Sequence, residues 1–171
     1  MCSSSSPDIV SLVLNYEVDL GMIESEINHR ALTAIPWIDD ELVIFCSSNH
    51  PLANKKQITT NDLVNARWVL READSGARQT FERAFQKHLP KLDIYLEFKH
   101  NEAIKRAVEA GLGIGCLSEK VLQSNFQDGT LVPLDVPKKH RMQRRFYFIV
   151  AKNRHRSLAM ERWVEKCGAS L

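Results

Sequence analysis

Short apolar runs alternate with segments of helical periodicity along most of this chain, and this alternation limits the possible folds more than any other feature of the sequence. The strand-like runs are residues 19–23, 33–37, 41–46, 67–70, 93–98, 114–117, 131–136 and 146–151. Helical segments separate many of them at distances typical of βαβ units, in which neighbouring strands are parallel. The sequence therefore predicts an α/β fold, with ligands expected where strands end and helices begin.

Small polar residues precede several of the expected helices, where a side chain can accept a hydrogen bond from a free backbone N–H group. The expected caps are Thr59 or Thr60, Ser75, Asn101, Ser118 and Ser157. Apolar residues at 9, 10, 13 and 14 predict a short helix near the start of the chain. Pro36 indicates that the run at 33–37 is an edge strand, because proline cannot donate a ladder hydrogen bond.

The overall composition excludes several classes of protein. With 171 residues, 44% of them hydrophobic, the chain can form one domain or two small lobes around a real core. A formal net charge of +2 does not by itself indicate a nucleic-acid-binding surface. No apolar run approaches the roughly 18 residues of a membrane span, and MCSSSSPD does not resemble a signal peptide. We therefore expect a cytoplasmic protein with no membrane partner, whose residues 1–7 form a disordered leader or an expression remnant.

Residues that commonly carry chemistry are scattered along the sequence. The cysteines form no CxxC pair, which argues against a zinc site or a disulfide framework. The histidines show neither HxxxH nor HExxH spacing, and no serine or cysteine lies in a nucleophile signature. We therefore expect no metal site, no cofactor and no catalytic residue.

The segment READSGARQTFER, residues 71–83, contains the strongest candidate for a binding site. The first N–H groups of a helix lack intrahelical acceptors and carry about half a positive charge. Gly76 would let a ligand approach the backbone, and the Ser75 hydroxyl would add a donor, which together suit a carboxylate, sulfate or phosphate. The alternative is that Ser75 only caps the helix. Asp74 adds negative charge, which an anion site does not favour.

Three other segments have a functional and a plainer interpretation. Asn101 begins the helix after the run at 93–98 and could meet the Ser75 region at one site, although a single Asn there is also an ordinary cap. The glycines at 110–115 follow a helix and precede a strand, whereas a phosphate-binding loop requires the reverse order. The basic run at 138–145 could contact nucleic acid, but it is more typical of a solvated loop before a strand.

A series of motifs occurs in a fixed order along the chain. They are DLGMIE at 19–24, DELVIFCSSNHPL at 40–52, WVLRE at 68–72, SGAR at 75–78, NEAIK at 101–105, VEAGLGIG at 108–115, RRFYFI at 144–149 and NR at 153–154. Each motif is weak alone, but in this order they resemble the motifs of LysR-type transcriptional regulators. The resemblance extends from about residue 8 to residue 167.

The resemblance implies an effector-binding domain with the fold of the type II periplasmic binding proteins. In that fold two α/β lobes are joined by two crossover strands, and a small effector binds in the cleft between them. Residues 8–40 would begin lobe I, 41–132 would form lobe II, and 133–171 would complete lobe I. The implied partners are a small anionic effector and further copies of the regulator, in a dimer or a tetramer.

The resemblance also implies a set of ligand-binding residues. The loop and helix start that line the family's cleft correspond to Asp74, Ser75, Gly76, Ala77 and Arg78. Asn101 would lie in the lobe II wall, and Glu24 and Ser25 would face the cleft from lobe I. Ala77 stands where the family commonly has Thr, which removes one side-chain donor and leaves the ligand class open among carboxylates, sulfate and phosphate.

Two parts of the family pattern are not found in this sequence. One is the helix-turn-helix with its linker helix, through which such regulators contact DNA. The other is the first strand, helix and second strand of lobe I, so lobe I is expected to be incomplete. An incomplete sheet exposes apolar edges. We therefore expect this chain to self-associate or to exchange segments between copies.

Three functions compete at this point. The favoured one is the ligand-sensing domain of a LysR-type regulator. A stand-alone solute-binding protein of the same fold would require a signal peptide. An enzyme on this fold would require acid and base groups clustered in the cleft, which the sequence does not display.

Overall fold

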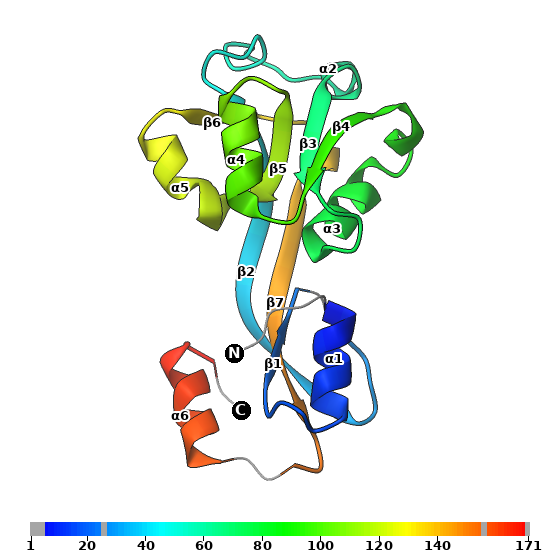
Figure 1. The fold of residues 1–171 in the computed structure, drawn as a ribbon, viewed down its shortest axis with the longest axis vertical. Coiled ribbons are helices and arrows are strands. Elements are labelled where there is room, and N and C mark those ends of the chain that lie inside the picture. Colours follow the sequence, from blue (N-terminus) through cyan, green and yellow to red (C-terminus); the bar gives the residue numbers. More distant parts are fainter. Residues whose placement is uncertain (1–5, 25–26, 155–156, 170–171) are drawn as a thin grey trace. The chain divides into compact units, whose positions relative to one another are not determined.

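The computed structural model describes residues 6–24, 27–154 and 157–169 and divides into two compact units. Unit 1 contains Met1–Asp39 and Arg144–Leu171, and unit 2 contains Asp40–Gln143. The chain passes between the units within two long strands, β2 (Leu32–Ser47) and β7 (Met142–Ala151) (Figure 1). The predicted fold class, α/β units connected by two strands, is confirmed.

Helices and strands follow one another in nearly the order that the sequence predicts. The helices are α1 (Ser6–Leu14), α2 (Thr60–Val64), α3 (Gly76–Phe85), α4 (Asn101–Glu109), α5 (Glu119–Gln127) and α6 (Leu158–Lys166), with short 3-10 turns η1 (Leu89–Lys91) and η2 (Lys138–His140). The remaining strands are β1 (Gly21–Ile23), β3 (Arg67–Arg71), β4 (Asp93–Phe98), β5 (Ile114–Ser118) and β6 (Leu131–Pro133). The strand order is β1-β7-β2-β5-β3-β4, and β6 pairs with β2.

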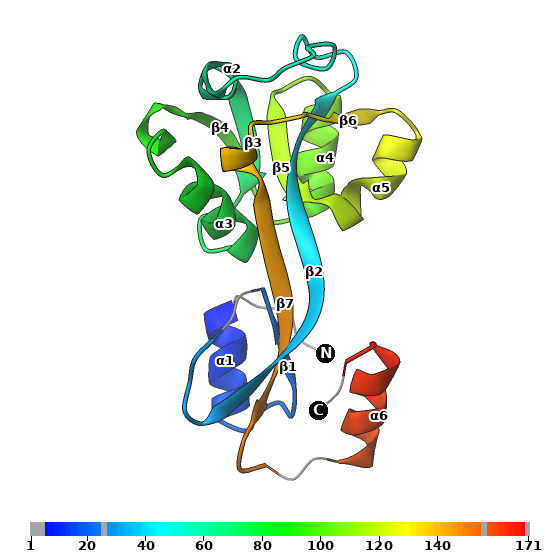
Figure 2. The same ribbon diagram turned by 180° about the vertical axis from the view of Figure 1, so that it is seen from behind.

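A mixed sheet forms the centre of unit 2. β3 pairs in parallel with β4 and β5, whereas β2 pairs antiparallel with β5 and β6. One face packs against α2 and α3 around Trp68, Phe81 and Phe85, and the other packs against α4 and α5 around Phe45 and Leu122. Helix α4 covers β5 and β3 in Figure 1, and η2 lies on the opposite face in Figure 2. Because both faces are covered, the inner strands β3 and β5 are apolar on both sides, whereas β4 alternates between exposed and half-buried residues.

Unit 1 has a smaller core. β1 pairs antiparallel with β7, and α1 buries Ile9 and Val13 against Ile149 of β7. The other side of β7 faces α6, where the rings of Trp163 and Phe148 lie 5.6 Å apart. Alternate residues of β7 therefore serve two different helices, as the period of a strand requires.

The predicted caps are confirmed at four helices. The hydroxyls of Ser75, Ser118 and Ser157 each accept a hydrogen bond from a backbone N–H group in the first turn of α3, α5 and α6. At α2, Thr59 forms a capping box with Asp62. Local sequence alone was sufficient here because a cap depends only on residues within one turn.

The prediction of separate strands at 33–37 and 41–46 is wrong, because both belong to the continuous strand β2. Asp39 and Asp40, which separate the two apolar runs, stay in the strand because each carboxylate accepts a hydrogen bond from another segment. Pro36 lies before the part of β2 that pairs with β5 and β6, so its missing N–H group interrupts neither of those ladders.

The prediction of a solvated loop at 138–145 is also wrong. The turn η2 and the first residues of β7 occupy this segment. Arg144 donates to Glu24 at 2.7 Å, and Arg145 forms two hydrogen bonds with Asp39. The basic side chains therefore pair with acidic residues from distant parts of the sequence, which a local charge pattern cannot reveal.

The return from unit 2 to unit 1 falls within β7, later than the position after 132 that the resemblance implies. The intervening residues pack on unit 2: the Leu134 N–H group donates to β2, and the His140 ring stacks on Phe85 with 4.4 Å between centroids. Near the other end, α1 begins at Ser6 and so includes part of the expected leader, whose first five positions lie outside the described residues.

No helix in the described part of the chain is long and apolar enough to span a membrane.

Candidate functional site

Two helices begin side by side at one edge of the unit 2 sheet. β3 and β4 are parallel neighbours, and their last residues, Arg71 and Phe98, lie opposite each other. α3 follows β3 after a short turn, and α4 follows β4. The N-termini of both helices are therefore brought to the same edge, where their free N–H groups and dipoles favour negative charge.

The first of these helix starts is organised by Ser75. Its backbone is extended (φ −73°, ψ 143°), its N–H group donates to the Glu72 carbonyl, and its Oγ accepts from the Arg78 N–H group at 3.1 Å. The hydroxyl hydrogen remains able to donate to another acceptor. Gly76 and Ala77 supply the first amides of the helix, which have no acceptor within it. Ser75 thus caps the helix, as the plainer interpretation stated, and also keeps a donor.

Arg71 connects the two helix starts. Its Nε and Nη2 donate to both oxygens of Glu72 at 2.8 and 2.9 Å, and its Nη1 donates to Asn101 Oδ1 at 3.1 Å. These hydrogen bonds from Arg71 lower the pKa of the Glu72 carboxyl. Asn101 is not the cap that the sequence predicts: it is the first residue of α4, and the cap position is His100, whose side chain makes no capping bond.

Arg78 connects the start of α3 to the strands beside it. Its guanidinium is 6% exposed and donates to Glu97 at 2.6 Å, to Glu82 at 2.8 Å and to the Arg71 carbonyl at 2.9 Å. These contacts tie α3 to β3 and β4. The structure therefore places the Arg78 side chain among the protein's own carboxylates, where it positions the helix start.

The other predicted site residues differ in their surroundings. Asp74 is exposed, and the Ala77 side chain is buried. Glu24 belongs to unit 1, where it accepts a hydrogen bond from Arg144. Ser25 lies outside the described residues. The structure therefore brings together the predicted residues of unit 2, and the assignment of Glu24 and Ser25 stays a prediction.

Two cations near this edge were not predicted as site residues. One is Arg71, which lies within the WVLRE motif but has no local signature of binding. The other is Lys105, one helical turn after Asn101 and therefore on the same face of α4. Lys105 is buried, and its ammonium contacts Glu102 at 2.6 Å. The contact of Arg71 with Asn101 of α4 and the burial of Lys105 both arise from the fold, so a local pattern could not reveal them.

At the start of the neighbouring helix α5, the cap residue contacts a carboxylate of the protein itself. The cap, Ser118, donates its hydroxyl to the carboxylate of Asp40 at 2.6 Å, and Asp40 is 6% exposed. A carboxylate from the protein thus occupies the start of α5. By the same physics, the starts of α3 and α4 suit a carboxylate or another small anion supplied from outside.

No group of three or more His, Cys, Asp or Glu side chains that could bind a metal ion is found in residues 6–24, 27–154 and 157–169. Cys46 and Cys116 are buried in the core, and burial raises the pKa of the Cys46 thiol to about 11, which keeps it protonated and unreactive. The groups found at the starts of α3 and α4 are hydrogen-bond donors, which suit the binding of an anion.

These features define a ligand-binding domain of the type II periplasmic-binding-protein class. Within that class, the chain belongs to the LysR substrate-binding domain family, whose model matches residues 1–171. The regulatory domain of Synechocystis PCC6803 CcmR, solved in complex with 2-PG, is similar, with a TM-score of 0.84 and 28% identity over 96% of this chain and 78% of that one. The effector-binding domain of QuiR in complex with shikimate has a TM-score of 0.78 and 20% identity, covering 96% of this chain and 77% of that one.

Curated relatives are transcriptional regulators. The chain is 38% identical over 163 residues to the HTH-type regulator YeiE of Escherichia coli K12, covering 95% of this chain and 55% of YeiE. It is 34% identical over 129 residues to the activator CmpR of Synechocystis, covering 75% and 42% of the two chains. The chain therefore spans about half the length of the curated relatives that it matches.

Proposed function

We propose that this chain is the effector-binding domain of a LysR-type transcriptional regulator and that it binds a small anion where α3 and α4 begin. The regulator would contact DNA through a helix-turn-helix that this sequence does not contain, and it would act as a dimer or tetramer. The effector would favour one of two states of the regulator by binding it more tightly.

One observation carries the proposal: two helix starts share one sheet edge and are linked by a single guanidinium. Arg71 reaches Asn101 of α4 from the end of β3, one short turn before Ser75 of α3. In the proposed site, backbone amides, a hydroxyl, an amide side chain and a guanidinium would face the same anion, to which all of them can donate hydrogen bonds.

The expected ligand is a small carboxylate, sulfate or phosphate. The CcmR domain, which is 28% identical to this chain over the matched region, has been solved in complex with 2-PG, and this supports a small ligand here. The first amides of α3 and the Ser75 hydroxyl would donate to the anion, and the Arg71 guanidinium, held by Glu72 and Asn101, would lie beside it. Arg78 would hold the helix start in place, because its buried guanidinium donates to Glu82, Glu97 and the Arg71 carbonyl.

A thermal-shift and calorimetric titration with acetate, sulfate and phosphate tests the proposal. Ser75→Ala should reduce the free energy of anion binding by about 1.5–3 kcal/mol, the value of one charge-assisted hydrogen bond. Ser157→Ala is the matched control, because it removes a cap of the same geometry from α6 in unit 1. Equal anion responses in the two variants, or no response to any of these anions in the unmodified chain, would refute the proposed site.

A further inference from the structure

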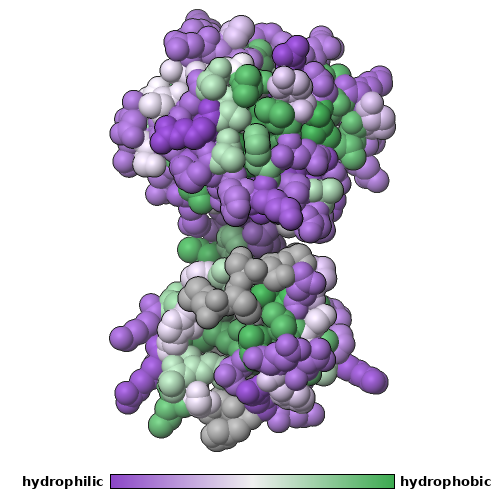
Figure 3. Space-filling model, viewed as in Figure 1, coloured by the Kyte–Doolittle hydropathy of each residue, from purple (hydrophilic) through white to green (hydrophobic). Residues whose placement is uncertain are grey.

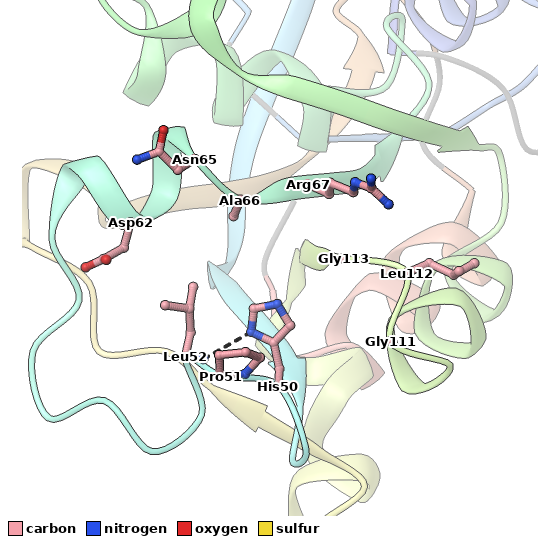
Figure 4. A pocket seen from close by; sticks show the side chains of 10 residues that line it. All are labelled: His50, Pro51, Leu52, Asp62, Asn65, Ala66, Arg67, Gly111, Leu112 and Gly113. Carbon is pink, nitrogen blue, oxygen red and sulfur yellow. Dashed lines mark hydrogen bonds between the residues drawn. The ribbon is translucent and has the colours of Figure 1, made fainter.

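A cavity lies at the edge of the unit 2 sheet opposite to the starts of α3 and α4. Its volume is about 340 Å³, which is within the range of small-molecule sites. It is lined by the turn after β2, the end of α2, the first residue of β3 and the loop before β5 (Figure 4). Because β3 and β5 are parallel, these segments mark the amino ends of both strands, whereas α3 and α4 begin at the carboxyl ends.

His50 supplies a hydrogen-bond donor inside this cavity. Its Nδ1 accepts from the Leu52 N–H group at 3.2 Å, so the ring proton resides on Nε2. Figure 4 shows the other ring nitrogen turned toward the side of the cavity formed by Arg67 and Gly113. Burial lowers the pKa of His50, which favours this neutral tautomer. The imidazole therefore presents one N–H group of known direction.

Arg67 supplies a positive charge at the rim. The ion pair between Arg67 and Asp93 is 3.8 Å long, and both side chains are more than half exposed, so that pair contributes little. The guanidinium lies over the Tyr95 ring at 5.1 Å, which orients its plane. A Cβ on Gly113 would come within 2.5 Å of the Arg67 carbonyl, so the wall between His50 and Arg67 is bare backbone.

The negative charge of Asp62, the acidic residue that lines the cavity, is paired with a lysine of the protein. Both oxygens of Asp62 contact Lys55 Nζ at 2.7 Å, and hydrogen bonds from Lys55 and Thr59 lower the pKa of its carboxyl to about 2. Figure 4 shows this carboxylate turned away from His50. The remaining lining includes the apolar residues Leu52, Ala66 and Leu112.

We propose that this cavity is a second ligand site, which binds a small monocarboxylate with an apolar body. The carboxylate contacts His50 Nε2 and the Arg67 guanidinium, and the apolar part lies against Leu52, Ala66 and Leu112. The proposal is independent of the effector site at the start of α3, because the two sites share no residue and lie at opposite edges of the sheet.

A titration of ¹⁵N-labelled protein with benzoate, followed by amide chemical shifts, tests this site. The expected result is a saturable shift of the Leu52, Ala66 and Gly113 amides. Arg67→Gln should weaken binding at least about tenfold, as expected for a lost charge-assisted contact. Leu112→Asp should abolish it by placing a negative charge at the rim. Arg106→Gln, which removes an exposed arginine elsewhere in unit 2, is the control and should change nothing.

Three outcomes would overturn the proposal. Shifts confined to Gly76 and Asn101 would place benzoate at the effector site alone. Equal binding of neutral benzyl alcohol would show an apolar cavity that does not recognise a carboxylate. No saturable shift of these amides up to about 10 mM, the weak end of ligand affinities, would show that the cavity does not bind this class of molecule. None of these results depends on the anion response of Ser75.

Discussion

Helices cover the sheet to different extents in the two units of this protein. Unit 2 buries both faces of its sheet under helices, and its large exposed hydrophobic side chains are Tyr95 and Leu112. Unit 1 is smaller, and its described residues include four such side chains, which are Tyr16, Met22, Leu158 and Trp163. Figure 3 shows hydrophobic side chains on the visible face of unit 1 between α1 and α6. Unit 2 therefore has a self-contained core, and unit 1 is expected to be the less stable part.

The largest difference between the units should appear at their tryptophans. Trp68 is fully buried, packs edge-on to Phe81 and Phe85, and donates to the Leu63 carbonyl. Trp68→Ala should lower the free energy of unfolding by about 3–5 kcal/mol. Trp163→Ala in unit 1 should cost far less, since that side chain is 46% exposed. Urea unfolding followed by circular dichroism measures both, and equal costs would contradict the difference in packing.

Two glycines test how well each unit tolerates an added methyl group. A Cβ on Gly115 would lie 2.6 Å from the fully buried Phe45 ring, and one on Gly21 would lie 2.6 Å from Ile9 of α1. Each alanine should cost about 1–3 kcal/mol as overpacking. Gly115→Ala should cost more, because α1 can shift outward in the loosely packed unit 1. The midpoints of urea unfolding measure both losses of stability. A larger loss for Gly21→Ala than for Gly115→Ala would contradict this prediction.

The pH dependence of stability should arise mainly in unit 2. His140 is buried on Phe85, and burial lowers its pKa below the ordinary value of 6.5. The unfolded chain then binds the proton more readily, so stability should fall as pH drops below about 6.5. His140→Phe should reduce this slope, although His50, whose pKa is also lowered, should keep part of it. Thermal unfolding between pH 7.5 and 5 measures the slope. The exposed His100, changed to Gln, is the control.

A charged substitution at Met22 is expected to change the free energy of unfolding least of all, but to weaken self-association clearly. β1 is the terminal strand of the sheet, and Met22 is 48% exposed on it. We expect the chain to self-associate through unit 1 and Met22→Lys to weaken that association, because a charge on an edge strand opposes pairing. Sedimentation velocity over a range of concentrations tests this. Tyr95→Lys, an equally exposed position in unit 2, should have no effect, and a monomeric unmodified chain would rule the idea out.

Much of the candidate site could be predicted from the sequence, but not the residues whose side chains link its separate segments. Ser75 and the start of α3 were accessible because cap, glycine and helix follow one another directly. Arg71 and Lys105 were not identified, since Arg71 reaches Asn101 of α4 across thirty residues of sequence and Lys105 is buried only in the folded unit. Asn101 was placed correctly at the start of α4, yet its predicted role as a cap was wrong because Arg71 occupies its side-chain oxygen.

The sequence by itself determined the alternation of strands and helices, the caps at Thr59, Ser75, Ser118 and Ser157, and the family. These features depend on patterns within one or two turns of chain or on the order of short motifs. Only the tertiary structure decided that β2 is continuous, that Arg144 and Arg145 pair with acidic residues of distant segments, and that two helix starts meet at one edge. The physical reason is that the charged and hydrogen-bonding groups of these residues find their partners far away in the sequence. A local sequence pattern therefore cannot identify those partners.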